Sequence, residues 1–340
     1  MTQVGVAAPD PAVSVPVPSV WLGETGLRVS RLGLGLAALG RPMYMAVGRK
    51  FDLGPDRSVA AMRRHCQSML DAAYAAGIRY IDAARSYGLA EQFLNAWWSA
   101  RGLPDRAMIV GSKWGYIYTG RWDLNAPVHE IKHLSVQMLR RQAYQSGVIL
   151  GSRLSLYQIH SATLDSGVLD DGAVLKQLVH LRESGLCVGL TVTGPRQGDT
   201  IRRALDVRVD GVRPFQTVQA TWNLLDPSAA AALRDASAEG WGVILKEVLA
   251  NGRLTSRYGG GRLRDLRARA AAVGTSVETV AVAADLSQPW ADIVLTGAVR
   301  YDHLRAHTAA LDVTVDAGDF ASMAEPAPEY WRRRELLRWT

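Results

Sequence analysis

The chain has 340 residues, 48% of them hydrophobic and 21% charged, and a net charge of +7. This length can build one large core or two ordinary ones. The basic residues are scattered, which argues against a nucleic-acid partner, and no apolar stretch is long enough to require a membrane. The two cysteines, Cys66 and Cys187, lie in apolar segments and indicate neither a disulfide framework nor a zinc ribbon. They fit a cytoplasmic protein.

The N-terminal region differs in composition from the rest of the chain. Residues 1–19 are rich in Ala, Val and Pro and lack a signal-peptide pattern, so we expect a flexible tail. The stretch WLGETGLRVS, which begins at Trp21, predicts a short β-hairpin. No linker interrupts residues 21–320, so we expect residues 20–340 to form a single domain.

Eight short apolar runs alternate with helix-like segments. Such near-continuous apolar runs are typical of strands that are covered on both faces. Thr275 and Glu278 form a capping-box pattern before one of the helices. Eight alternating units predict a (β/α)8 TIM barrel, whereas a doubly wound sheet would usually divide into two domains. The expected strands span residues 32–36, 78–82, 107–112, 154–160, 186–192, 214–220, 241–246 and 291–296.

Polar residues stand where three neighbouring strands end. Asp82 ends the second strand and Tyr87 follows it, Lys113 ends the third strand, and His160 ends the fourth. Alone, each has an ordinary structural explanation, such as a helix cap, a packed loop ring, a solvated charge or a core histidine. Because the carboxyl ends of barrel strands converge on one mouth, we expect the four side chains to lie together.

Together these four residues could donate a proton. A free phenol has a pKa near about 10 and is a poor acid at neutral pH. A nearby ammonium would lower that pKa, and a carboxylate would hold the ammonium in place. The expected roles are therefore proton donor for Tyr87, charge support for Lys113 and Asp82, and orientation of a substrate oxygen for His160. Reduction of a carbonyl group by hydride needs such a proton.

Five motifs between about residue 21 and about residue 315 resemble the aldo-keto reductase superfamily: LGLG, YIDAARSYG, SKWG, LYQIH and VQATWNLL. The resemblance implies a TIM barrel that binds NADP(H) without a Rossmann domain. It places the family's catalytic residues on Asp82, Tyr87, Lys113 and His160. The implied activity is NAD(P)H-dependent reduction of an aldehyde or ketone, or the reverse oxidation of an alcohol or sugar.

The resemblance also implies cofactor contacts, with two departures. Gln219, Asn223 and Thr191 match residues that hold the nicotinamide carboxamide, although Val192 replaces the usual asparagine after Thr191. Lys246 occupies the place of the ring that usually stacks on the nicotinamide. The segment after the last strand should hold the phosphates, and it favours NADP over NAD. Its expected contacts are Gly297, Ala298, Arg300, His303 and His307.

Aromatic and sulfur-containing side chains are frequent in the loops at the expected mouth. We expect Tyr44, Trp114, Trp122 and Trp222 to line the substrate pocket, although many such rings pack loops against a barrel. Aromatic walls favour a bulky or cyclic small-molecule carbonyl compound. No cluster of anion-binding residues is evident there, so a carboxylated substrate is not expected. The sequence leaves the oligomeric state open.

Two other functions remain open. The departures at Val192 and Lys246 fit a cofactor-binding regulatory subunit with little turnover. The stretch HEIKH at residues 129–133 matches the metalloprotease motif, which would make a zinc hydrolase. In a helix over about residues 127–146, Ile131 would be buried while His129 and His133 would face solvent. We therefore expect no metal site.

Overall fold

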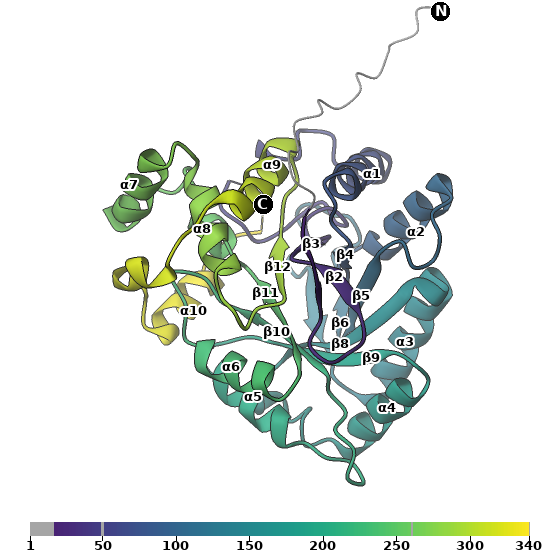
Figure 1. Ribbon diagram of the computed structural model, residues 1–340. Helices are drawn as coiled ribbons and strands as arrows, with labels where there is room; N and C mark the ends of the chain where they lie inside the picture. The colour runs from purple at the N-terminus through teal and green to yellow at the C-terminus, as the bar shows by residue number, and fades with distance from the viewer. Residues whose placement is uncertain (1–16, 49–50, 260, 340) are drawn as a thin grey trace, which may run out of the picture.

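The computed structural model describes residues 17–48, 51–259 and 261–339. Eight strands form a closed barrel, in the order β10-β11-β12-β3-β4-β5-β8-β9, with parallel pairing throughout (Figure 1). The predicted (β/α)8 barrel is confirmed, and each predicted apolar run overlaps one barrel strand. These strands are β3 (Leu32–Gly35), β4 (Tyr80–Asp82), β5 (Ile109–Trp114), β8 (Leu154–Ala162), β9 (Cys187–Val192), β10 (Thr217–Thr221), β11 (Gly242–Lys246) and β12 (Ile293–Thr296).

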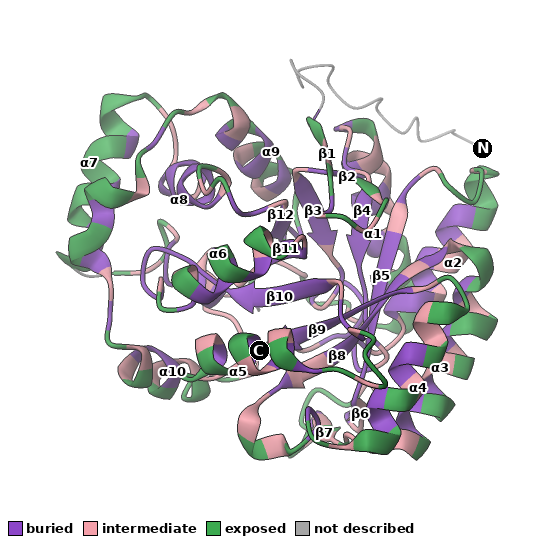
Figure 2. Ribbon diagram, turned by 60° about the horizontal axis from the view of Figure 1, so that its bottom comes forward, coloured by how far each residue is buried: buried purple, intermediate pink, exposed green. Residues whose placement is uncertain are grey.

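Helices surround the barrel and turn their buried faces toward it (Figure 2). In α1, for example, Met62, Cys66, Met69 and Leu70 form the buried stripe at helical spacing, and the side chain of Ser58 caps the first turn. The helices are α1 (Val59–Ala75), α2 (Ala90–Arg101), α3 (Val136–Leu150), α4 (Gly172–Glu183), α5 (Gln197–Asp206), α6 (Ala230–Ala238), α7 (Arg264–Ala272), α8 (Val277–Leu286), α9 (Tyr301–Ala309) and α10 (Ala327–Glu335).

An N-terminal hairpin closes the end of the barrel where the strands begin. Its strands are β1 (Ser19–Trp21) and β2 (Arg28–Ser30), as predicted. Leu22 is fully buried in a cluster with Leu156 and Ile293 inside the barrel. Gly23 has φ +48°, and a Cβ atom there would lie 2.4 Å from the backbone nitrogen of Gly242. The hairpin therefore needs glycine at this contact.

The predicted tail of residues 1–19 lies mostly outside the described residues. Within it, Val17 is buried and its amide donates to the carbonyl of Ala76 at 3.3 Å. Ser19 already begins β1. The ordered fold therefore starts before the predicted boundary, because the hairpin and α1 provide partners for this segment.

The segment around HEIKH is not the predicted helix. Residues Glu130–Lys132 form β7, which pairs with β6 (Tyr116–Tyr118) in an antiparallel ribbon, and α3 begins only after its cap at Ser135. Ile131, expected to be buried, is 52% exposed, and His129, expected to face solvent, is buried. His133 is exposed as expected. His129 and His133 therefore do not form the i, i+4 pair on a helix that the metalloprotease motif needs.

The predicted capping box before α8 does not form, because the N-cap lies one residue later than expected. Ser276, not Thr275, is the N-cap, and its hydroxyl accepts from the amide of Thr279 at 3.1 Å. Glu278 accordingly does not complete a box. Its carboxylate accepts from the amide and hydroxyl of Ser256, each at 2.8 Å.

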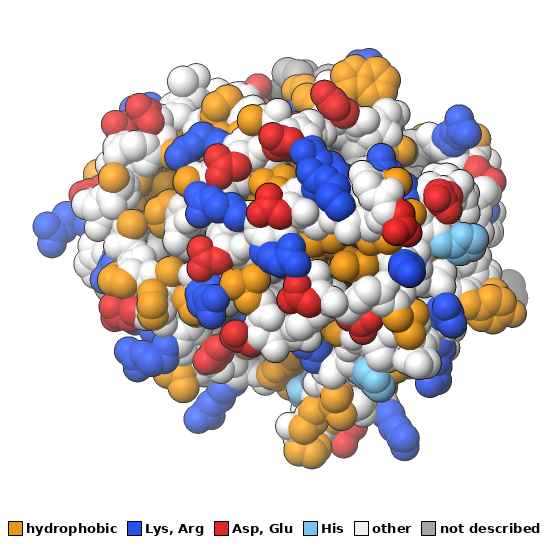
Figure 3. All heavy atoms as spheres, turned by 90° about the horizontal axis from the view of Figure 1, so that it is seen from below, with side chains coloured by type: hydrophobic (Ala, Val, Ile, Leu, Met, Phe, Trp, Pro, Cys, Tyr) orange, Lys and Arg blue, Asp and Glu red, His pale blue; other side chains and the backbone are white. Residues whose placement is uncertain are grey.

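The outer surface carries mixed charges. On the face in Figure 3, Lys and Arg side chains alternate with Asp and Glu and do not gather into one continuous basic patch. Among the described residues, no helix is both long enough and apolar enough to cross a membrane.

Candidate active site

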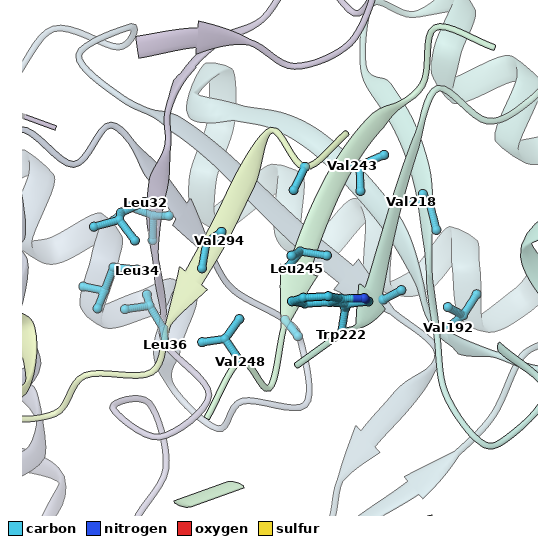
Figure 4. Close-up of a cluster of buried hydrophobic side chains, with 14 of the residues drawn as sticks. Leu32, Leu34, Leu36, Val192, Val218, Trp222, Val243, Leu245, Val248 and Val294 are labelled. Atoms are coloured by element: carbon cyan, nitrogen blue, oxygen red, sulfur yellow. The ribbon is translucent and has the colours of Figure 1, made fainter. Parts of the chain in front are cut away.

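Strand alternation selects which side chains point into the barrel. Leu32, Leu34, Val243, Leu245 and Val294 pack in the larger core outside the strands (Figure 4). Their neighbours along the same strands point inward because successive side chains of a strand face opposite sides. At the carboxyl ends of the strands, the inward positions are held by Asp82, Lys113, His160, Thr191, Gln219 and Lys246.

The structure brings the four predicted catalytic side chains together. The buried ammonium of Lys113 forms an ion pair with Asp82 and donates to the phenol oxygen of Tyr87 at 3.3 Å. Gln219 Nε2 donates to the second oxygen of Asp82 at 2.8 Å. The imidazole of His160 meets the ring of Tyr87 edge to face, with 5.5 Å between ring centroids. One phenol, one ammonium and one imidazole thus share a small buried volume.

The environment of Tyr87 keeps its phenol protonated. Burial raises the pKa of Tyr87 well above its usual value, the charge of Asp82 raises it further, and the guanidinium of Arg41 opposes both. This direction is opposite to the lowering that we expected from Lys113. The physical reason is that burial penalises the phenolate more than nearby cations stabilise it.

His160 is a neutral imidazole in this site. Burial lowers the pKa of His160 well below its usual value, and the charges of Lys113, Arg41, Lys246 and Lys132 lower it further. Its Nδ1 lies 3.4 Å from the hydroxyl of Ser86. A neutral ring can offer a hydrogen bond to a substrate oxygen without adding another positive charge.

These side chains open into a cavity of about 530 Å³, within the size range of ligand pockets. Two groups of lining residues carry most of its polar atoms. We name the reaction end for the residues around Tyr87, which are Arg41, Tyr44, Asp82, Tyr116, Glu130, His160, Gln219, Lys246, Glu247, Arg334 and Trp339. We name the acidic end for the residues near the first turns of α8 and α9, which are Asp52, Ser256, Arg257, Ser276, Glu278, Asp302 and His303.

Five of the predicted cofactor residues line this cavity, namely Gln219, Lys246, Gly297, His303 and His307. His307 is also hydrogen-bonded through Nδ1 to the hydroxyl of Thr296, and burial lowers the pKa of His307 to about 4. Its ring is therefore neutral at pH 7.

The other four predicted cofactor residues do not line the cavity. The hydroxyl of Thr191 accepts from the amide of Ser161 at 2.7 Å, and the amide group of Asn223 donates to Tyr330 and to the carbonyl of Glu247. Ala298 is fully buried. Arg300 points outward and pairs with Asp302 at 2.9 Å. These residues lie at the expected positions along the chain, but their polar atoms are already bound to other groups of the protein.

Lys246 and Glu247 both line the cavity, although neighbouring strand residues usually face opposite sides. The chain turns at Glu247, which has φ +55°, an uncommon value for a residue with a side chain. Burial would raise the pKa of Glu247, but Arg334 and Lys246 together lower it to about 2. Arg334 on α10 binds this carboxylate with two nitrogens, which ties the C-terminal helix to the site.

Of the predicted substrate-pocket rings, only Tyr44 lines the cavity. The structure places the three tryptophans elsewhere, which corrects that expectation. Trp114 follows the inward Lys113 and therefore points out into the core, where it is fully buried. Trp222 packs against Trp290 in the same core (Figure 4), and Trp122 donates to the carbonyl of Arg57 at 2.7 Å.

Several residues at the reaction end were not predicted. Arg41 is buried, pairs with Glu130 at 2.7 Å, and lies over the ring of Tyr87. Trp339 stacks on His129 with 4.6 Å between centroids, and Tyr116 meets the ring of His160 at 4.9 Å. Glu130 and His129 belong to HEIKH, so that stretch contributes to this site as a β-ribbon.

The donor atoms of the cavity suit a dinucleotide better than a metal. The described residues contain no group of three or more His, Cys, Asp or Glu side chains placed to hold a metal ion. Gly297 and Val299 line the cavity directly before α9, and the N-cap residue Arg300 makes no capping hydrogen bond. A Cβ atom on Gly297 would meet nothing within 4 Å, so there is open space for a phosphate beside the backbone of this segment.

Comparisons with known proteins agree with this geometry. Residues 32–327 match the model of the aldo/keto reductase family. The NADH-specific methylglyoxal reductase of Escherichia coli (strain K12) is 23% identical, over 90% of this chain and 97% of that protein. An aldo-keto reductase of Bacillus halodurans in its holo form shares the fold with a TM-score of 0.66 and 19% identity, over 92% of this chain and 97% of that one.

A second solved structure, described as an aldo-keto reductase from Pseudomonas aeruginosa, gives a TM-score of 0.64 at 23% identity. It is matched over 91% of this chain and 98% of its own. The family match spans most of the sequence, so it decides the assignment, while the solved structures support the fold. The chain belongs to the aldo/keto reductase family, whose members are oxidoreductases that act on carbonyl compounds.

Proposed function

We propose that this protein reduces an aldehyde or ketone to an alcohol with a reduced nicotinamide cofactor, and that Tyr87 donates the proton. The observation that carries the proposal is the buried Asp82–Lys113 pair beside the phenol of Tyr87, at the wall of a cavity of about 530 Å³. Such a cavity can exclude water while one proton donor faces the substrate.

When bound, the reduced nicotinamide supplies a hydride to the carbonyl carbon. The side chains of the protein orient and protonate the carbonyl oxygen of the substrate. His160 orients the carbonyl oxygen, and Tyr87 passes its phenolic proton to that oxygen as negative charge develops there. The ammonium of Lys113, 3.3 Å from the phenol oxygen, stabilises the resulting phenolate until a solvent proton replaces the one given up. One hydride and one proton are added, which balances the conversion of a carbonyl to an alcohol.

The direct test follows the absorbance of NADH and NADPH at substrate saturation with a panel of aldehydes and ketones. Carbonyl-dependent oxidation of the cofactor is the expected result. A regulatory subunit would instead bind the cofactor and show no turnover with any compound in the panel. The complete group of Asp82, Tyr87, Lys113 and His160 supports the enzyme over that alternative.

The residues at the acidic end bear on the choice between NADP and NAD. The sequence favours NADP through Arg300 and His303, but Arg300 is paired with Asp302, and burial lowers the pKa of His303 so that it is neutral at pH 7. Asp52 pairs with Arg257 at 2.7 Å, and Glu278 also lines the cavity. Carboxylates accept hydrogen bonds from a ribose diol and repel a 2′-phosphate. We therefore propose NAD as the preferred cofactor.

Titration of the protein with NADH and NADPH, read by fluorescence, is expected to give about tenfold tighter binding of NADH. Asp302→Ser should narrow or reverse this preference, because it frees Arg300 and removes a negative charge from the cavity wall. Glu239→Gln, a change at the end of α6 near the hairpin, serves as a control and should leave both affinities unchanged. Tighter binding of NADPH than of NADH by the unmodified protein would contradict this proposal and support NADP, as the sequence predicts.

The rings at the reaction end favour a bulky or cyclic substrate. Tyr44, Tyr116 and Trp339 line the cavity, with 6.4 Å between the ring centroids of Tyr44 and Trp339. Flat rings stack well on such walls and gain more from them than a short aliphatic chain does.

Trp339→Ala should therefore lower kcat/KM for an aromatic aldehyde by about 3- to 10-fold and leave that for a short aliphatic aldehyde nearly unchanged. Trp21→Ala, which removes an exposed ring of the hairpin, is the matched control. Equal losses for both aldehydes would show that Trp339 supports the fold of the site and does not select substrates.

A further inference from the structure

Five basic side chains lie in or directly behind the wall of the reaction end, against three carboxylates. They are Arg41, Lys113, Lys132, Lys246 and Arg334. Each of its carboxylates is already paired with a cation. The pairs are Asp82–Lys113, Glu130–Arg41 and Glu247–Arg334. Two further lysines, Lys132 and Lys246, lie close enough to lower the pKa of His160, and neither has a carboxylate of a described residue within 4.0 Å. Glu247 attracts Lys246 as well as Arg334, but three carboxylates cannot balance five basic side chains, so an excess of positive charge remains at this end.

Lys246 is the lysine of the two that lines the cavity. Its ammonium donates to the hydroxyl of Thr221 at 2.8 Å, the only acceptor that the described residues give it among three possible hydrogen bonds. Burial lowers the pKa of Lys246 to about 8, so the ammonium form still predominates at pH 7. A buried ammonium group whose other N–H groups have no acceptor is stabilised by an anion.

Lys132 adds to the positive electrostatic potential at the reaction end, although its side chain does not line the cavity. It reaches from β7, donates to the carbonyl of Ser161 at 2.7 Å, and lies over the ring of Tyr116 at 5.6 Å from the centroid. Both Ser161 and Tyr116 line the cavity. A negative group that contacts Lys246 would therefore also be attracted by Lys132.

The cofactor does not bring the missing charge to this end. A nicotinamide ring is neutral when reduced and positive when oxidised. The open space for the phosphates of a dinucleotide is beside Gly297, directly before α9. The substrate is the remaining source of a negative charge beside Tyr87 and His160.

We propose that the substrate is an aldehyde or ketone that carries a carboxylate, and that the ammonium of Lys246 binds this carboxylate. The inference rests on the proposed reductase function and narrows its substrate class. It reverses the expectation from the sequence, where Lys132 and Lys246 stand more than 100 positions apart and no anion-binding cluster is visible. Lys246 comes to His160 from the barrel strand β11, and Lys132 comes from the β6–β7 ribbon.

The test compares 4-formylbenzoate with its methyl ester, a matched pair in which only the ester lacks the charge. The unmodified enzyme, saturated with cofactor, should show at least about tenfold higher kcat/KM for the acid. Lys246→Met should lower the ratio of kcat/KM for the acid to kcat/KM for the ester by about 10- to 100-fold, the range for a hydrogen bond to a charged group.

Two further variants separate charge from packing. Lys246→Arg keeps the positive charge and should retain most of the preference for the acid. Lys176→Met removes an exposed lysine of α4 and should change nothing. Cofactor dissociation constants measured by fluorescence should agree within about twofold across all four proteins.

Three results would overturn the proposal. The unmodified enzyme could use the ester as well as the acid. Lys246→Met could reduce both substrates equally while weakening cofactor binding, which would assign Lys246 to the cofactor. If neither compound is turned over, the proposed reductase function is in question, and calorimetry with the alcohol 4-(hydroxymethyl)benzoate and its methyl ester then tests the carboxylate site by itself. Equal or absent binding of the two alcohols would exclude it.

Discussion

Tyr87→Phe should lower kcat for carbonyl reduction by about 10²- to 10⁴-fold, the range that a positioned general acid contributes. The phenol of Tyr87 lies 3.3 Å from the ammonium of Lys113 and its ring meets that of His160 edge to face, which is why we propose it as the proton donor. The dissociation constant of the reduced cofactor should stay within about twofold, because only a hydroxyl is lost. Absorbance at substrate saturation gives kcat, and fluorescence gives the dissociation constant.

Tyr116→Phe is the matched control for this change. Tyr116 lines the same cavity and also meets the ring of His160 edge to face, but the structure gives its hydroxyl no contact with Lys113. Its variant should keep kcat within a few fold. Near-normal kcat in Tyr87→Phe, or equal losses in the two variants, would contradict the assignment of the proton donor.

The same environment predicts the pH dependence of reduction. Because burial raises the pKa of Tyr87 well above its usual value, the phenol stays protonated and available through neutral and mildly alkaline pH. The reductive kcat of the unmodified enzyme should therefore not fall from ionisation of Tyr87 between about pH 7 and about pH 9. A steep loss of kcat in that interval, absent from Tyr87→Phe, would show a lowered phenol pKa instead.

The barrel, and the meeting of Asp82, Lys113 and His160 at its mouth, were predictable because both depend on local sequence patterns. Each strand is a short apolar run, and the carboxyl end of each run shows directly which polar residue faces the mouth. Asp82, Lys113 and His160 needed no knowledge of distant contacts beyond the order of the strands. Tyr87 lies in the loop directly after Asp82, so the sequence also predicts that it lies at the mouth of the barrel.

Other site residues could not be found in this way because distant segments bring them to the mouth. Trp339 reaches His129 and Arg41 across more than 200 positions, and nothing near it in the sequence indicates that contact. Glu130 was not predicted to lie at the site, because the motif HEIKH suggested a helix with its histidines facing solvent. The local pattern HEIKH does not distinguish a helix from a ribbon, and pairing with the segment Tyr116–Tyr118 decides the outcome.

Glu278 shows how a shift of one residue can conceal a site residue. As part of a capping box, its carboxylate would be bound at the start of α8. With Ser276 as the cap, that carboxylate turns to Ser256 and lines the cavity. The same segment would therefore give a helix cap in one register and gives a cavity-lining carboxylate in the other.

Lys113→Met should lower kcat by about 10²- to 10⁴-fold and also destabilise the protein, and these two effects can be separated. Removal of the ammonium leaves the phenolate of Tyr87 without its nearest cation and leaves Asp82 as a buried carboxylate without its ion pair. Breaking a buried pair from one side costs about 3–5 kcal/mol of the free energy of unfolding. Chemical denaturation measures that loss.

The double variant Asp82→Asn with Lys113→Met removes both charges and supplies the matched control. An amide at position 82 still hydrogen-bonds with Gln219, whose Nε2 lies 2.8 Å from the carboxylate in the unmodified protein. The double variant should recover most of the free energy of unfolding, because no uncompensated charge remains. It should not recover kcat, because the phenolate still lacks a cation. Parallel recovery of stability and kcat would mean that Lys113 only supports the fold and that the proton donor does not depend on its charge.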